Sequence, residues 1–317
     1  MAQLEGDVMV LGAGGKMGPS LVQLARRASD DAGTARRVIA VSRFKSPGLV
    51  QQLERGGIEV IAGDLLDPAF VANLPEVPNV ICMVGQKFGT AVDPTTTWVV
   101  NAFLPGIITR RFPASNLVVL STGNVYSLVP VAGSGSRESD SPEPVGEYAQ
   151  SALARERIVE SFATAQRTPT AMLRLNYAVE LRYGVLRDLA DLLVQGEPIS
   201  LAMGYVNIIW QRDANAVVLR SLGSCCVPPL ILNVTGPEKL AVRDLAWRLG
   251  TRLEVEPVFT DTERQTALLS DASRAHELFG APTADVDTLI DWVAEWVRRG
   301  GRSFDRPTHF QERAGRF

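Results

Sequence analysis

Histidine and cysteine are both scarce in this chain of 317 residues, which holds two histidines and three cysteines. The two histidines, His276 and His309, are too few for a histidine-rich metal site. Three cysteines cannot form a disulfide framework, and Cys82 stands in an apolar run typical of a buried thiol. The adjacent Cys225 and Cys226 could form a strained disulfide, although a reduced cytoplasmic pair fits better. We therefore predict no metal site and a cytoplasmic location.

The chain also lacks an excess of basic charge and any long hydrophobic run. Its net charge is −3, so it has no basic surplus to neutralise nucleic-acid phosphates. The longest apolar stretches, such as 80–85 and 228–234, are far shorter than the roughly 20 residues that span a bilayer. The opening residues MAQLEGD lack the basic region and cleavage pattern of a signal peptide. We expect a globular protein with neither a nucleic-acid nor a membrane partner.

Short apolar runs alternate with stretches of helical periodicity over the first 175 residues. Runs of strand length occupy residues 8–11, 38–41, 59–61, 80–84, 117–120 and 171–175. Amphipathic stretches of helical length fill most of the gaps, at 18–28, 48–55, 97–111 and 148–165. Continuous apolar strands separated by helices indicate a parallel sheet that is covered on both faces. The pattern predicts an α/β fold with a Rossmann-type, doubly wound parallel sheet.

This rhythm loosens after residue 175. Further helices are expected near 184–195, 212–222, 242–249 and 285–299, and short strands near 205–209 and 230–234. We predict a dinucleotide-binding domain over residues 1–175 and a smaller, partly interleaved substrate-binding region over 176–317. Residues 131–145 are rich in Gly, Ser and Pro, which is typical of a mobile loop. The polar tail 300–317 carries no recognisable pattern.

A glycine-rich segment, GAGGKMG, directly follows the first strand and opens the first helix. Gly12 permits the tight turn, Gly15 lets a pyrophosphate approach the backbone, and Gly18 allows the helix to pack closely on the strand. Free amides at the start of the helix then face the anionic pyrophosphate. Lys16 and Met17 lie between these glycines. A strand before the loop and a helix after it predict a nicotinamide dinucleotide site.

The second strand ends without the acidic residue that usually selects NAD. Ser42 and Arg43 stand there instead, and a guanidinium can pair with the 2′-phosphate of NADP. Lys16 could supply a second cation, whereas Arg43 and Lys45 could also be solvated loop charges. We therefore predict NADP as the preferred cofactor and NAD as the alternative.

The third strand ends in the residues GDLLD. At this position the Asp64 carboxylate, with Leu65 beside it, can approach the adenine amino group of the dinucleotide. We expect Asp67 to cap the N-terminus of the following helix.

Together these motifs resemble the extended short-chain dehydrogenase/reductase superfamily, in its NAD-dependent epimerase/dehydratase group. The resemblance runs over nearly the whole chain and includes, after the glycine loop and GDLLD, the segments VVNAFLPG, LSTGNVY, YAQSALARE and DASRAHELFG. It implies cofactor contacts at the end of the fourth strand, through Val84 and Gly85, and at Asn101. It also implies a homodimer formed through residues 97–111 and 148–165.

In that family a tyrosine exchanges the proton of a substrate hydroxyl while hydride moves to or from the nicotinamide. The matching residues here are Tyr148 and Thr122, of which Thr122 would hydrogen-bond the substrate oxygen. A tyrosine ordinarily has a pKa of about 10 and needs a nearby cation to act as a base at neutral pH. The family supplies a lysine four residues later, which also holds the nicotinamide ribose. This sequence has Ala152 at that position.

Three interpretations of Ala152 stay open. Another cation could substitute, and Lys87, just beyond the fourth strand, is the first candidate unless it is an exposed loop residue. Arg155 shares a helix face with Tyr148 but lies about 10 Å along the axis, which argues against direct contact. Alternatively, Tyr148 acts as an uncharged acid in a reduction. Finally, the protein could bind NADP(H) as a non-catalytic sensor or scaffold.

Two departures from the family's pattern bear on the substrate. The arginine that clamps nucleotide phosphates in the nucleotide-sugar enzymes is replaced by Val206, and their Asn-x-Tyr-Gly-Pro segment is reduced to NYAV at 176–179. Both favour a small hydroxylated compound, such as a free sugar or a sugar acid. The expected function is therefore an oxidoreductase or epimerase acting on a hydroxyl or carbonyl group of such a substrate. Expected substrate residues are Gln86, Lys87, Asn124, Asn176 and Trp210.

Overall fold

The computed structural model describes residues 1–316 and divides them into two units. Unit 1 is built from residues 1–122, 146–174 and 215–232, and unit 2 from residues 123–145, 175–214 and 233–316. Phe317, the end of the predicted tail, lies outside the described residues. The chain therefore passes between the units several times, and each unit is assembled from three separate segments.

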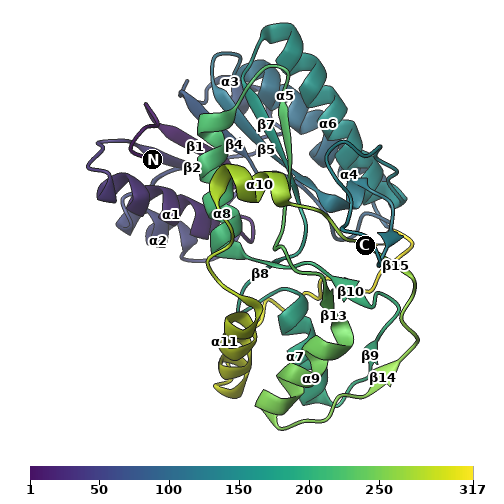
Figure 1. Ribbon diagram of the computed structural model, residues 1–317. Helices are drawn as coiled ribbons and strands as arrows, with labels where there is room; N and C mark the ends of the chain where they lie inside the picture. Colours follow the sequence, from purple (N-terminus) through teal and green to yellow (C-terminus); the bar gives the residue numbers. More distant parts are fainter. Residues whose placement is uncertain (317) are drawn as a thin grey trace. The chain divides into compact units, whose positions relative to one another are not determined.

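A seven-stranded sheet lies at the centre of unit 1, flanked by helices on both faces (Figure 1). Its order is β12-β7-β5-β4-β1-β2-β3. The strands are β1 (Val8–Leu11), β2 (Val38–Ser42), β3 (Glu59–Ala62), β4 (Asn79–Cys82), β5 (Asn116–Thr122), β7 (Thr170–Leu175) and β12 (Leu230–Val234). The pairs from β3 across to β5 are parallel. The predicted Rossmann-type α/β fold is confirmed.

Strand order reverses between β1 and β4, which both lie at the centre of the sheet. In sheets of this kind, ligands bind outside the carboxyl ends of the strands at this reversal point. Every residue of β1 and β4 is buried, because helices cover both faces of the sheet. Met9 and Leu11 join one core cluster together with Ile108 and Val159 from two of the helices.

Five main helices flank the sheet in unit 1. They are α1 (Gly18–Asp31), α2 (Leu49–Arg55), α3 (Pro68–Ala72), α5 (Leu104–Arg111) and α6 (Gly146–Gln166). The helix expected over 97–111 is divided into α4 (Pro94–Trp98), the π-helical turn η1 (Val99–Phe103) and α5. Pro105 explains the interruption, because it has no N–H to donate to the carbonyl oxygen of Asn101 four residues earlier.

Unit 2 has an apolar core of its own, formed by the helices α7 (Val185–Gln195), α9 (Val242–Leu253) and α11 (Val286–Arg298). Its remaining elements are short: η2 (Gly123–Val125), β6 (Val129–Pro130), β8 (Ala178–Val179), β9 (Ile199–Ser200), β10 (Tyr205–Val206), β11 (Ile209–Trp210), β13 (Leu240–Ala241), β14 (Phe259–Thr260), β15 (Thr266–Ala267) and α10 (Ser273–Phe279). Helix α8 (Gln211–Ser221) contributes to both units, and η3 (Leu222–Ser224) follows it in unit 1.

Two segments of unit 2 are more firmly held than their composition indicates. In the segment 131–145, whose composition predicts a mobile loop, Ser136 donates its amide to Leu269 and Glu138 accepts the amide of Asn233. In the tail, Phe310 is buried in the core and Arg313 donates to the carbonyl oxygen of Thr266 at 2.7 Å. The tail therefore packs as part of unit 2.

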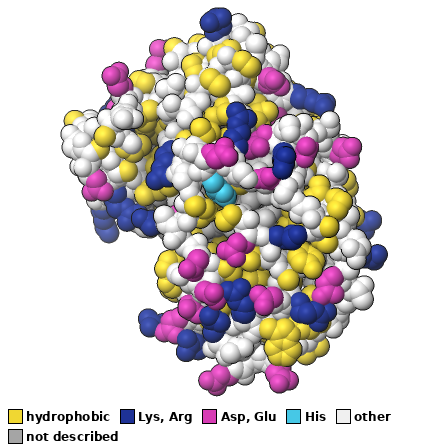
Figure 2. Space-filling view, viewed as in Figure 1, with side chains coloured by type: hydrophobic (Ala, Val, Ile, Leu, Met, Phe, Trp, Pro, Cys, Tyr) yellow, Lys and Arg dark blue, Asp and Glu magenta, His cyan; other side chains and the backbone are white. Residues whose placement is uncertain are grey.

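None of the helices in residues 1–316 is long and apolar enough to cross a membrane. On the face seen in Figure 2, lysine and arginine side chains are interspersed with aspartate and glutamate. No patch of one sign dominates this face.

Candidate functional site

The glycine loop follows β1 at the carboxyl edge of the sheet, beside the end of β4. Gly12 has a φ of 86°, in the left-handed region that favours glycine. A Cβ on Gly12 would lie 3.1 Å from the amide nitrogen of Val84, and one on Gly18 only 2.3 Å from the carbonyl oxygen of Ala13. The absence of side chains therefore lets the loop pass against the end of β4 and lets α1 begin directly behind the loop.

The middle of the loop is open. Gly15 is exposed, and the nearest atom to a Cβ placed there would be the carbonyl oxygen of Gly12 at 3.3 Å. Helix α1 has no side-chain cap at Met17 and no acidic residue in its first turn. Its second residue, Pro19, has no N–H, so the other amides at the start of the helix are the ones that can face an anion. Lys16 adds a half-buried cation in the same loop. This cradle fits the diphosphate of a dinucleotide.

The carboxyl end of β2 borders the loop. Ser42 lies against it, since a Cβ on Gly14 would be 2.7 Å from the Ser42 hydroxyl oxygen. Arg43 is mostly exposed and lies 3.7 Å from the carboxylate of Asp64 at the end of β3. The structure therefore brings Ser42, Arg43 and Asp64 together beside the loop. The ion pair between Arg43 and Asp64 is exposed and weak, so Arg43 could leave Asp64 and pair with a bound anion instead.

The turn after β3 is shaped by packing. A Cβ on Gly63 would overlap the ring of Phe70, and Leu65 is buried. The Asp67 carboxylate accepts the amide of Ala69 at 2.9 Å and caps α3, which confirms the predicted cap.

A buried polar cluster lies under the end of β4. Asn101 in η1 is completely buried; its side-chain oxygen accepts the amide of Gln86 at 2.7 Å, and its amide group donates to the Gln86 carbonyl at 2.9 Å. The same amide group donates to the Ser151 hydroxyl in α6 at 3.0 Å. Asn101 thereby holds the loop that carries Val84 and Gly85 against α6.

Arg155, whose spacing along the helix argued against direct contact with Tyr148, completes this cluster. Its Nε donates to the Asn101 carbonyl at 2.7 Å, and its Nη2 lies 3.1 Å from the Asn101 side-chain oxygen. Its Nη1 donates to the carbonyl of Leu120 in β5. Long helical side chains lean toward the helix N-terminus, so a guanidinium lies well back from its own Cα. That direction, added to the seven-residue spacing from Tyr148, is the signal that could have identified Arg155.

The two catalytic residues implied by the family resemblance lie in neighbouring elements of unit 1. Thr122 ends β5 and is 5% exposed, and Tyr148 lies half-buried in the first turn of α6. Ala152, one turn later, is completely buried. The Lys87 ammonium lies 5.8 Å from the centre of the Phe88 ring, in the loop after β4.

Helix α6 is fixed by a buried ion pair one turn beyond Ala152. Glu156 lies 2.7 Å from Arg174 in β7, and both side chains are 4% exposed. The Ser121 hydroxyl, next to Thr122, donates to the same carboxylate. These contacts join α6 to β5 and β7 and so hold Thr122 and Tyr148 on connected elements.

Of the expected substrate residues, Gln86 and Lys87 belong to unit 1, whereas Asn124, Asn176 and Trp210 belong to unit 2. Asn124 is half-buried in η2, and Asn176 is buried and donates to the carbonyl of Leu268 at 3.4 Å. Trp210 meets Trp292 edge to face, with ring centroids 5.4 Å apart. Val206 is completely buried in the core of unit 2. Within residues 1–316 no group of three or more His, Cys, Asp or Glu side chains is arranged to hold a metal ion.

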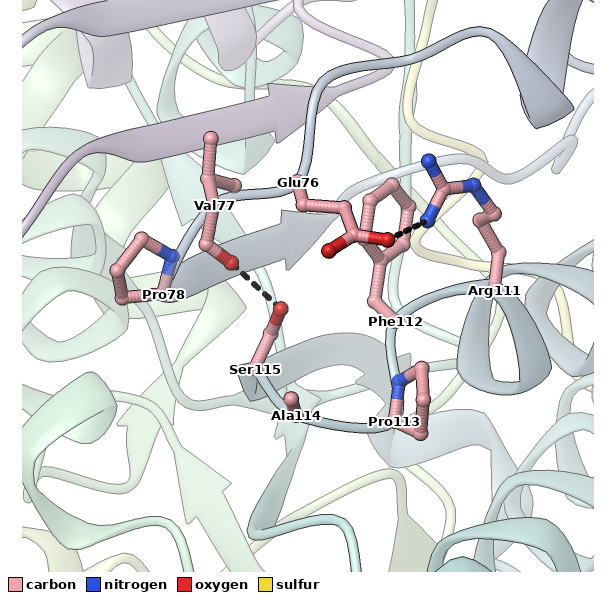
Figure 3. A pocket seen from close by; sticks show the side chains of 8 residues that line it. All are labelled: Glu76, Val77, Pro78, Arg111, Phe112, Pro113, Ala114 and Ser115. Carbon is pink, nitrogen blue, oxygen red and sulfur yellow. Dashed lines mark hydrogen bonds and ion pairs between the residues drawn. The ribbon is translucent and has the colours of Figure 1, made fainter.

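A separate pocket of about 340 Å³ lies at the opposite edge of the sheet, before the first residues of β4 and β5 (Figure 3). There the guanidinium of Arg111 lies 3.5 Å from the carboxylate of Glu76 and donates to the carbonyl of Leu74 at 2.6 Å. The Ser115 hydroxyl donates to Val77. These contacts join the end of α5 and the residue before β5 to the segment between α3 and β4, at the opposite ends of the strands from the glycine loop.

The comparisons with known proteins identify the family of this chain. A family model described as the NAD dependent epimerase/dehydratase family matches residues 8–179, just over half of the chain. The chain therefore belongs to the NAD-dependent epimerase/dehydratase family, whose members are enzymes that use a nicotinamide dinucleotide. No curated protein sequence matches it.

Solved structures show the same fold. MoeE5 in complex with UDP-glucose and NAD is 19% identical, with 93% of this chain and 99% of that chain covered and a TM-score of 0.76. UDP-glucuronic acid 4-epimerase from Bacillus cereus is 16% identical, with 92% and 99% covered and a TM-score of 0.78. UDP-glucose 4-epimerase from Thermus thermophilus, in complex with NAD, is 18% identical, with 92% and 99% covered and a TM-score of 0.75.

The open backbone at Gly15 generates a first prediction. Gly15→Val should weaken dinucleotide binding about tenfold or more, because the added side chain would occupy the approach to the loop amides. Its melting temperature should stay close to that of the wild type, since little lies near the new side chain. Binding of NADP and NAD is measured by calorimetry, and melting by circular dichroism.

Gly18→Val is the matched comparison. Its Cβ would overlap the backbone of Ala13, so this variant should lose both stability and binding. Wild-type dinucleotide affinity in a folded Gly15→Val protein would contradict the assignment of the loop.

Proposed function

We propose that this protein is an NAD(P)-dependent oxidoreductase or epimerase that acts on a hydroxyl or carbonyl group of a small carbohydrate-like substrate. One observation carries the proposal: an open glycine loop lies beside the end of β4 at one edge of the unit 1 sheet. Asn101 holds the loop after β4 against α6. Helix α6 also carries Tyr148, and the neighbouring strand β5 ends in Thr122. Family membership supports the nicotinamide chemistry.

In this proposal the bound dinucleotide would accept hydride from a carbon of the substrate or donate hydride to it. Tyr148 gives or takes the proton at the oxygen on that carbon. Thr122 donates its hydroxyl to the same oxygen and orients it. The buried contacts of Glu156 keep the helix and strand that carry these two side chains in register.

We further propose a free sugar or sugar acid as the substrate, in contrast to the UDP-sugars named with several of the similar structures. The support is Val206, which stands where nucleotide-sugar enzymes have their phosphate clamp. Its side chain is completely buried in an apolar core and has no charge to offer a phosphate.

NADP is the cofactor that we propose this site prefers. The end of β2 presents Ser42 and the exposed Arg43, which lies beside the carboxylate of Asp64 in the turn after β3. A 2′-phosphate would offer Arg43 a doubly charged, bidentate partner in place of this 3.7 Å surface contact.

We also propose a homodimer and a cytoplasmic location. The support for the homodimer is an exposed apolar surface on α4 and η1, formed by Trp98, Val99 and Phe103, of which Phe103 is 60% exposed. Apolar side chains gathered on one helix surface are typical of an interface. The support for the cytoplasm is the adjacent Cys225 and Cys226, both free thiols. Recovery of the native protein outside the cytoplasm would contradict the location.

Tyr148→Phe should lower kcat about 100-fold or more, because the phenylalanine ring cannot exchange a proton. Candidate aldoses, uronic acids and UDP-sugars are incubated with NADP or NAD while the absorbance of reduced nicotinamide is followed. A stoichiometric absorbance change indicates a dehydrogenase, and product without a net change indicates an epimerase.

Tyr205→Phe, in unit 2, is the control and should keep wild-type kcat. Full turnover by Tyr148→Phe would overturn the catalytic role of this residue. Binding of NADP with no turnover of any candidate would instead favour a sensor or scaffold, and turnover of UDP-sugars alone would overturn the proposed substrate.

NADP should bind about tenfold or more tightly than NAD, and Arg43→Ala should remove most of that difference. Lys45→Ala, which removes an exposed cation two residues further on, should leave both affinities unchanged. Ser42→Asp should shift the preference toward NAD, because it introduces a carboxylate for the ribose hydroxyls. Equal affinities of the wild type for the two dinucleotides would rule out this assignment.

Phe103→Glu should convert a dimer into a monomer in analytical ultracentrifugation, because it places a charge in the proposed interface. Val194→Glu, at a position that is 57% exposed on α7, should leave the dimer intact. A wild-type protein that sediments as a monomer at micromolar concentration would contradict the homodimer.

A further inference from the structure

Arg155 joins three elements of unit 1 through one buried guanidinium. The residue is only 5% exposed. From α6 its Nε donates to the Asn101 carbonyl in η1 at 2.7 Å, its Nη2 donates to the Asn101 side-chain oxygen at 3.1 Å, and its Nη1 donates to the Leu120 carbonyl in β5. All three acceptors are neutral, and the neighbouring Glu156 carboxylate is paired with Arg174. Burial of a charge in this way is costly, so we expect Arg155 to have a role beyond stability.

The guanidinium fills the space directly behind Gly85. A Cβ on Gly85 would lie 3.1 Å from Nη2 of Arg155, which is tighter than an ordinary van der Waals contact. The guanidinium cannot easily move aside, because three acceptors hold it. Gly85 itself is exposed, and the amide of Val84 before it is the group that Gly12 approaches. Arg155 therefore supports from behind a backbone segment that borders the glycine loop.

The sheet order indicates which half of a dinucleotide this segment would meet. Strands β2 and β3 lie on one side of β1, and β4 and β5 lie on the other. In the proposed site the loop after β1 holds the diphosphate, and Ser42 and Arg43 at the end of β2 hold the adenosine half. A dinucleotide binds across the reversal point of such a sheet, so its nicotinamide half would lie over the ends of β4 and β5. The exposed backbone at Gly85 follows the first of these ends, and Thr122 marks the second.

We propose that Arg155 is a positioning residue for the nicotinamide half of the dinucleotide, which it serves by holding the backbone of Val84 and Gly85 in place. This inference rests on the proposed function for the location of the dinucleotide. It deepens that function by naming the residue on which binding of one half depends. Arg155 acts through Asn101 and Gly85 and does not touch the dinucleotide.

The test compares each dinucleotide with a fragment that lacks the nicotinamide half. Binding of NADP and 2′,5′-ADP, and of NAD and ADP, is measured by calorimetry on the full chain. Arg155→Met should weaken the binding of both dinucleotides about tenfold or more, because the backbone at Gly85 loses its support. It should leave the affinities for the two fragments within about twofold of the wild type, because the adenosine half binds on the β2 side.

Two further variants separate positioning from charge. Arg155→Lys keeps a positive charge but loses the planar fork that reaches three acceptors, so it should behave like Arg155→Met. Arg157→Met is the matched control, since this exposed arginine lies two residues further along α6. It should leave the binding of all four ligands unchanged.

Gly85→Ala tests the same contact from the loop and keeps the proposal testable if Arg155→Met does not fold. Its Cβ would press on Nη2, so it should weaken the dinucleotides and spare the fragments. Arg155→Ala removes the side chain that the Cβ would meet, so Gly85→Ala should cause little further loss in that background. The two substitutions should therefore be strongly non-additive.

An Arg155→Met protein that folds and binds both dinucleotides like the wild type would overturn the proposal. An equal loss for dinucleotides and fragments would also overturn it, because it would indicate general damage to unit 1. Wild-type binding by Arg155→Lys would assign the effect to charge and contradict positioning, and an unaffected Gly85→Ala would count against the contact. All of these are binding measurements, whereas turnover by Tyr148→Phe tests the proposed catalysis, so the two can fail separately.

Discussion

The carbonyl group of Asn101 is the constraint on which the active edge of unit 1 depends. In a regular α-helix it would accept the amide of residue 105, but that residue is a proline and has no N–H. The helix forms a π turn over η1, and the carbonyl accepts the Nε of Arg155 instead. One missing amide thereby creates a site for a buried guanidinium, and the Asn101 side chain, held by the same turn, fixes the loop after β4.

Two different kinds of local order meet at this edge. On the β1 side the glycine loop is shaped by the absence of side chains, because Cβ atoms on Gly12 or Gly18 would meet backbone atoms. On the β4 side the loop is held by a dense polar cluster around Asn101. Gly85 lies between the glycine loop and the polar cluster. It is partly exposed, and it lies against the Arg155 guanidinium of the cluster. Backbone is therefore the surface that a bound dinucleotide would meet on either side.

The sequence predicted those parts of the protein that depend on neighbours along the chain. The parallel sheet follows from buried apolar runs such as Val8–Leu11, and the Asp67 cap follows from its place before a helix. Arg155 is missed when its distance from Tyr148 is measured along the helix axis alone, without the backward lean of a long side chain. The anchoring of residues 131–145 was missed because partners such as Asn233 are more than 90 residues away. The packing of Phe310 was missed because the polar tail carries no pattern of its own, and the core that receives it is drawn from several distant segments.

A guanidinium at Arg155 and an ammonium at position 152 would differ in more than their location. Three acceptors hold the Arg155 guanidinium in one orientation, and a guanidinium stays charged under conditions where a buried ammonium can lose its proton. The charge that Arg155 provides is accordingly immobile, and its three nitrogens each already have a hydrogen-bond acceptor within the protein. A guanidinium held in this way has little capacity left to hold the hydroxyls of a ribose. In the proposed site, binding of the nicotinamide half would then fall more heavily on the backbone of Val84 and Gly85.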